Sequence, residues 1–328
     1  MREVAFLKAN AEKWKQFERL VRSPKGADPD RLAELFVQLT DDLSYARTFY
    51  PQSKTTQYLN GLAAEVHQAI YRNRREDRRR FVTFWRRELP EVMAASRREL
   101  LVSFVVFALS VGVGVLSAAG DGTFARLILG DGYVNMTLAN IDRGDPMAVY
   151  KQAHEMDMFL AITFNNVRVS FLAFALGLLA SFGTGYVLFS NGVMLGAFHY
   201  LFYEHQLLGP SLLVVYIHGA LEISAVVVAG CAGLVLGNGI LFPGTYTRTE
   251  SLVRAAKRGL KIVVGLVPIF VAAGFLEGFV TRHTGMPAAV GIAIIAASFG
   301  FVLWYFVLYP YRCYPPSPST AAATSATF

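Results

Sequence analysis

The stretch SLLVVYIHGALEISAVVVAGCAGLVLG (211–237) decides the fold class of this chain, because its 27 residues carry one formal charge, on Glu222. At a rise of about 1.5 Å per residue, a helix of this length crosses the hydrocarbon core of a bilayer. His218 and Glu222 are four residues apart, so they lie on one face of that helix. Ionisable groups at this depth are costly and usually functional, which makes this face the first candidate site.

Three roles fit that face: a structural clamp between helices, part of a substrate or proton pathway, or part of a catalytic site. Small residues on the same helix, which let neighbouring helices approach closely, fit the clamp. A zinc enzyme would need a third ligand, for which His199 is the candidate. His199 alone, however, is typical of a core histidine, and the helical metalloprotease motif has glutamate where this chain has Gly219. We therefore predict no catalytic residue, no metal and no other cofactor.

The charged residues gather towards the N-terminus. Residues 1–100 hold 20 of the 31 lysines and arginines and 14 of the 24 aspartates and glutamates. Helical periodicity predicts a cytosolic helical domain over residues 1–98. Ten arginines between residues 72 and 98 precede the first apolar run. This pattern is typical of a cytoplasmic membrane flank, or of binding to anionic lipids or a protein partner, and it argues against nucleic-acid binding.

The sequence predicts an all-α, polytopic membrane protein with about six transmembrane helices over residues 99–310 and a disordered tail over residues 311–328. An acidic segment, residues 120–160, is expected outside the membrane after the first span. The predicted spans are Leu100–Ala119, a second from about Phe164, Val193–His205, Ser211–Gly237, Ile262–Phe279 with Pro268 inside it, and Pro287–Leu308.

The second and third spans share one uncharged run, residues 169–203. A straight helix over this run would be about 52 Å long, which exceeds a hydrocarbon core of about 30 Å. The run therefore has to turn. We prefer Ser190-Asn191-Gly192 as the turn, with Gly183-Thr184-Gly185 as the alternative.

Charge bias sets the expected orientation. Residues 245–261, between the fourth and fifth spans, carry five basic residues and one acidic residue. Six spans place both termini on one side of the membrane, and the basic flanks place that side in the cytoplasm. The chain is therefore predicted to reside in the cytoplasmic (inner) membrane as a multi-pass protein.

Further polar residues lie at the ends of the spans. Asn165, Asn166 and Arg168 open the second span, and Glu277 lies near the outer end of the fifth. Arg168 and Glu277 could pair at that interface. In the alternative, Arg168 extends to the interface by itself and Glu277 contacts water.

Several motifs resemble the stage II sporulation protein M family, in its longer form with a cytosolic N-terminal region. They are DLSYARTFYP (42–51), YLNGL (58–62), FNNVRVSF (164–171), the pattern of Thr184, Asn191, Gly192 and Gly196, and HGALEISAVVVAGCAGLVLG (218–237). The resemblance runs from about residue 40 to residue 310. It implies a polytopic protein that organises partners such as cell-wall hydrolases at the cell envelope, and it supplies no catalytic residues. The N-terminal region and the larger external segment depart from the founding members, which act in engulfment during spore formation.

Two hypotheses from different classes follow. The leading one is a non-enzymatic membrane scaffold that contacts lipids, binds protein partners in the envelope or cytosol, and forms a homo-oligomer, such as a homodimer, through the small residues of span four. The alternative is a transporter or lipid flippase that uses His218 and Glu222. An intramembrane metal-dependent hydrolase is the third hypothesis.

Overall fold

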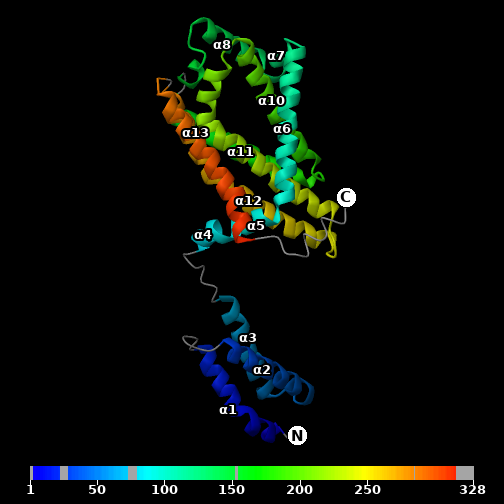
Figure 1. The fold of residues 1–328 in the computed structure, drawn as a ribbon. Helices are drawn as coiled ribbons and strands as arrows, with labels where there is room; N and C mark the ends of the chain where they lie inside the picture. The colour runs from blue at the N-terminus through cyan, green and yellow to red at the C-terminus, as the bar shows by residue number, and fades with distance from the viewer. Residues whose placement is uncertain (1–2, 23–28, 73–79, 152–153, 284, 315–328) are drawn as a thin grey trace. The chain divides into compact units, whose positions relative to one another are not determined.

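The computed structural model describes residues 3–22, 29–72, 80–151, 154–283 and 285–314 (Figure 1). Every regular element within these ranges is a helix, as the sequence predicts. The chain forms two compact units, residues 1–80 and residues 81–328. The N-terminal domain predicted over residues 1–98 is longer than the first unit, because residues 81–98 belong to the second unit. Residues 315–328 of the predicted disordered tail lie outside the described residues.

The first unit consists of three helices, α1 (Glu3–Arg22), α2 (Pro29–Phe49) and α3 (Lys54–Arg72). Apolar side chains at helical spacing bury one face of each helix in a shared core, which includes Phe17, Leu39 and Leu59. Trp14 donates a 2.8 Å hydrogen bond from Nε1 to the Asp42 carboxylate. The unit therefore has a hydrophobic core of its own.

The second unit begins with a segment that lies against its long helices. This segment holds α4 (Arg80–Thr83), the π-helix η1 (Phe84–Glu88) and α5 (Leu89–Ala95). Leu89 and Met93 are fully buried in the core of the unit. Tyr305 donates a 2.6 Å hydrogen bond to the carbonyl of Trp85. This part of the arginine-rich segment packs on protein, while residues 73–79 are not among the described residues.

Five helical stretches in the described ranges are long and apolar enough to cross a membrane. They are α6 (Arg97–Gly120), α9 with η3 (Glu155–Leu178), α11 (Leu208–Leu241), α12 with η4 (Arg248–Thr281), and α13 with η5 and α14 (Ala288–Cys313). The chain is an all-α membrane protein. The predicted count of six is not confirmed, because α10 (Phe182–Glu204), which holds the predicted third span, is not in this set. α10 lies alongside α6 (Figure 1).

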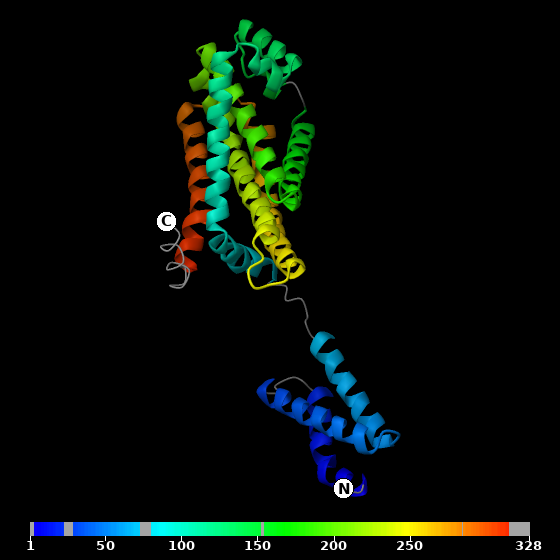
Figure 2. The ribbon, with the colours of Figure 1, turned by 90° about the vertical axis from the view of Figure 1, so that its right-hand side faces the viewer.

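Short helices lie at one end of the long helices, and α5 lies at the other (Figure 2). The short helices are α7 (Phe124–Leu129), α8 (Asp131–Asp142) and η2 (Ala148–Lys151). They occupy most of the segment predicted to be external. The second span starts earlier than predicted, because α9 begins at Glu155 rather than near Phe164.

The preferred turn at Ser190-Asn191-Gly192 is wrong, because these residues lie inside α10. The chain turns earlier, after the short 3-10 helix η3 (Leu176–Leu178), where Ala180 and Ser181 have positive φ angles of 50° and 69°. The alternative, Gly183-Thr184-Gly185, lies in the first turn of α10, directly after the turn. The turn was missed because Ala180 and Ser181 are not the glycine or asparagine that usually marks such a backbone.

The basic residues between the predicted fourth and fifth spans are helical rather than a loop. α12 (Arg248–Phe275) begins at the start of this stretch. Thr247 caps the helix by accepting a 3.3 Å hydrogen bond from the backbone nitrogen of Glu250. The helix continues through Pro268.

α11 is the most deeply buried of the long helices. Its small residues allow neighbouring helices to approach closely: Gly233 lies against Thr184 and Ala173, and Gly230 lies against Leu188. Both glycines are buried within the chain. The small-residue face that led us to expect a homodimer is therefore occupied by helices of the same chain.

Candidate functional site: a buried His–Glu–Glu cluster

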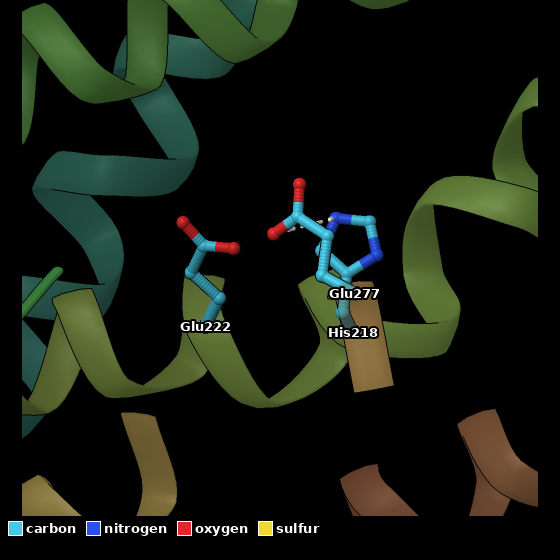
Figure 3. Close-up of side chains that lie close together, drawn as sticks. All are labelled: His218, Glu222 and Glu277. Carbon is cyan, nitrogen blue, oxygen red and sulfur yellow. Dashed lines mark ion pairs between the residues drawn. The ribbon is translucent and has the colours of Figure 1, made fainter. Parts of the chain in front are cut away.

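The structure brings a third ionisable side chain to His218 and Glu222. These two residues project from one face of α11, and Glu277 reaches them from the π-helix η4 (Leu276–Thr281) that follows α12 (Figure 3). The Nε2 atom of His218 lies 3.7 Å from an Oε2 oxygen of Glu277. One nitrogen or oxygen atom from each residue lies within 4.8 Å of the other two. We call these three residues the His–Glu–Glu cluster.

The π-helix η4 positions Glu277 and Thr281 against α11. A π turn holds more residues than an α turn, so it changes the direction in which the following side chains point. The Thr281 hydroxyl lies 3.1 Å from Nδ1 of His218. π turns of this kind are frequent at functional sites. The backbone of η4, which continues α12, therefore brings Glu277 and Thr281, about one turn apart, to His218.

Hydrogen bonding orients the His218 ring. The Thr281 hydroxyl lies where it donates to the carbonyl of Leu276, at 3.1 Å. With its proton used there, the same oxygen accepts from His218, and this arrangement assigns the ring hydrogen to Nδ1. The lone pair of Nε2 is consequently directed towards Glu277. The imidazole presents a basic nitrogen to the two carboxylates.

Asn166 approaches the cluster from α9. Its side chain is buried, with 4% of the residue exposed, and its amide interacts with the Glu222 carboxyl group. Nδ2 of Asn166 has no geometric hydrogen-bond partner among the described residues. Asn165 and Arg168 are exposed. Of the polar run that opens the second span, only Asn166 therefore joins the site.

A cavity of about 350 Å³ adjoins the cluster. Its polar side is formed by His218 and Glu222, with Gly219 between them on α11. Apolar residues of α7 and α10 form most of the rest. Tyr133 of α8 also lines it. Burial raises the pKa of the Tyr133 phenol, and a hydrogen bond with Thr137 opposes this shift. The short helices at this end of the unit thus help to enclose the cluster.

The two carboxylates of the cluster have no lysine or arginine partner in the described ranges. No lysine or arginine nitrogen lies within ion-pair distance of Glu222 or Glu277 there. Arg282, at the end of η4, pairs with Glu155 at 3.0 Å. The side chains of His218 and Glu277 are only 6% and 12% exposed. Ionised carboxylates are costly at such burial, so the cluster has to take up protons or a cation.

Two sequence-based pairings differ from the observed contacts. Glu277 pairs with His218 and not with Arg168, because η4 turns Glu277 towards α11. His199 lies outside the cluster, and the third potential ligand is Glu277. The ring of His199 contacts the backbone carbonyl of Leu195 through Nδ1, at 2.7 Å. His199 therefore hydrogen-bonds within its own helix through Nδ1, while its Nε2 is buried without a hydrogen-bond partner among the described residues, unlike the fully satisfied core histidine that was expected.

Two residues of the site were missed by sequence reasoning. Thr281 and Tyr133 have no unusual sequence context, and a tyrosine near the end of a membrane span is common. Neither spacing nor hydropathy indicates that they approach His218 or Glu277. Only the tertiary packing of η4 and α8 brings them there.

Comparison with known proteins gives two family matches. A family model described as Stage II sporulation protein M matches residues 103–282, which include the whole His–Glu–Glu cluster, Asn166 and Thr281. A second model, described as a domain of unknown function (DUF8413), matches residues 4–72, the three helices of the first unit. Neither the curated proteins nor the solved structures contain a match.

Proposed function

The chain belongs to the stage II sporulation protein M family, and on this basis we propose that it is a multi-pass scaffold of the cytoplasmic membrane that assembles envelope partners such as cell-wall hydrolases. The observation that carries the proposal is the division into two units, each with its own core and its own family match. A separately folded helical unit joined to a membrane unit suits a protein that holds a partner at the membrane.

The surface of the N-terminal unit supports partner binding. Three apolar side chains lie outside the core of the unit: Val4, Val37 and Phe49 are 65%, 59% and 60% exposed. Exposed apolar side chains mark contact with another protein where they form a continuous patch. We propose that this unit binds a cytosolic or membrane-bound protein.

The placement of charge supports cytoplasmic termini. Arg97 at the start of α6 donates a 2.7 Å hydrogen bond to the carbonyl of Tyr314, so the two ends of the membrane unit lie on one side. The basic first half of α12 lies there too, since Arg258 donates a 3.0 Å hydrogen bond to Ser96. Positive charge gathered at one end of the helices favours that end as the cytoplasmic one.

Deleting residues 1–80 is expected to abolish partner recovery while the membrane unit still inserts, because the core of residues 81–328 is complete without them. Tagged full-length and truncated chains are isolated from native membranes in mild detergent, and bound proteins are compared by quantitative mass spectrometry. Resistance of the truncated chain to alkaline extraction is the control for insertion. Equal recovery with both chains, or no stable partner of the full-length chain, would contradict the proposal.

A second candidate, a transporter or lipid flippase, is favoured by the neighbourhood of the cluster. An apolar groove of about 690 Å³ lies between α6, α11 and α13, and it shares Leu195 and Ile223 with the polar cavity. The groove is lined by apolar side chains such as Phe104 and Phe299, while the cavity contains Glu222. This arrangement suits an amphiphile whose tail lies in the groove and whose polar group reaches the cluster.

The flippase hypothesis predicts that Glu222→Gln removes activity, because it neutralises the polar wall without a change of shape. The full-length protein is reconstituted in liposomes containing fluorescent phospholipids, and scrambling is measured by quenching of the outer leaflet. His199→Gln, which changes a histidine outside the cluster, is the matched control and is expected to keep wild-type activity. Absence of scrambling by the folded wild-type protein would eliminate this candidate for phospholipids.

A further inference from the structure

We propose that the His–Glu–Glu cluster binds one divalent transition-metal ion, and that Zn²⁺ is the ion its donors suit best. This inference does not depend on the scaffold or the flippase proposal. The cluster offers one imidazole nitrogen and one oxygen from each of two carboxylates. Zinc accepts both kinds of donor, and zinc sites with three protein ligands leave a fourth position for water or substrate.

The spacing of the donors fits an ion of this size. Tetrahedral zinc with bonds of about 2.0–2.2 Å separates any two of its ligand atoms by about 3.4 Å. The His218 and Glu277 atoms are 3.7 Å apart, and the whole set lies within 4.8 Å. Movements of about 1 Å in the glutamate side chains would complete the site, which is within the range of small rotamer changes.

The residues behind the donors support a metal site independently of the donor set. A metal-binding histidine usually donates its other ring N–H to a neighbouring group, which fixes the ring. Nδ1 of His218 does this with Thr281, so Nε2 is left as the ligand atom. Asn166, which is more than nine-tenths buried and has an amide donor without a hydrogen-bond partner in the described ranges, interacts with Glu222. Its amide can orient that carboxylate.

The charge balance also favours a divalent cation. A neutral imidazole and two carboxylates carry a formal charge of −2, and no lysine or arginine in the described ranges pairs with either carboxylate. One divalent ion makes the buried group neutral and replaces the water lost on burial with metal–ligand bonds. Tyr133 lines the cavity that adjoins the cluster.

Zinc binding is tested with the full-length protein in mild detergent. The protein is stripped with a chelator, and Zn²⁺ is titrated in competition with a chromophoric chelator. The expected result is one high-affinity Zn²⁺ per chain, which is retained after desalting and measured by elemental analysis. A folded wild-type protein that retains far less than one Zn²⁺ per chain would overturn the proposal.

Variants distinguish this site from adventitious binding. His218→Gln and Glu277→Gln are expected to weaken zinc binding by about 100-fold or more, and Thr281→Val by about 10–100-fold, because loss of an outer partner typically has the latter effect. His199→Gln, which changes a partly buried histidine of α10 outside the cluster, should bind zinc as the wild type does. Cooperative thermal unfolding shows that each variant is folded. If His218→Gln does not fold, Thr281→Val provides the test, and wild-type zinc affinity in this variant would overturn the assignment. Equal losses of zinc affinity in His199→Gln and Glu277→Gln would also overturn it.

Discussion

Replacing Leu39 by alanine is expected to lower the free energy of unfolding of the N-terminal unit by about 2–5 kcal/mol. Leu39 lies on α2, is 1% exposed, and packs in the core formed by all three helices of the unit. Truncation removes apolar contacts and leaves a cavity that the helices can fill only in part. A unit of this size has little stability in reserve, so the loss should be a large share of the total.

Val37→Ala is the matched control for Leu39→Ala. Val37 lies two residues away on the same helix but is 59% exposed, so we expect a change within about 0.5 kcal/mol. Both variants are measured by urea unfolding of residues 1–80, followed by far-UV circular dichroism. Equal losses in the two variants would show that α2 does not bury the face described above. Failure of the wild-type fragment to unfold cooperatively would contradict its independence from the membrane unit.

Replacing Gly114 by alanine is expected to destabilise the membrane unit by about 1–3 kcal/mol, the usual cost of forcing an extra methyl group into a packed contact. Gly114 lies on α6, where a Cβ atom would collide with the backbone carbonyl oxygen of Val193 on α10. Backbone atoms cannot move aside as a side chain can, so the two helices would have to separate. The contact between α6 and α10 is thus sensitive to the addition of a single methyl group.

Gly112→Ala serves as the control on the same helix. No atom of a neighbouring element lies within 4 Å of a Cβ atom placed there, so the change should be neutral or stabilising by up to about 1 kcal/mol. Unfolding of the full-length variants in mixed detergent micelles is measured by circular dichroism. If Gly114→Ala proves as stable as Gly112→Ala, α10 does not pack on α6 as described.

Hydropathy and helical spacing predicted much of this fold. The single charge within residues 211–237 indicated a long membrane helix, and α11 covers that stretch completely. The spacing of four between His218 and Glu222 predicted a shared face, which the structure confirms. These features depend only on residues within a few helical turns of each position. The local sequence is therefore enough to predict them.

The contacts that complete the site depend on distant parts of the chain, and sequence spacing does not report them. Glu277 was expected at the outer interface near Arg168, but the π turn of η4 directs it to His218. The turn at Ala180 and Ser181 was likewise missed, because helix packing rather than residue preference imposes its backbone. Hydropathy predicted where helices lie and could not predict which of their faces meet.

The contacts between the start and the end of the membrane unit affect the order in which it is built on the ribosome. The carbonyls of Trp85 and Arg86 receive hydrogen bonds from Tyr305 and Tyr309, more than 200 residues later. During synthesis, the segment before α6 emerges first but cannot reach its final partners until the last helix has left the translocon. A nascent chain halted before residue 305 therefore lacks the contacts that Tyr305 and Tyr309 make with the segment before α6, even though most of its helices have already been inserted.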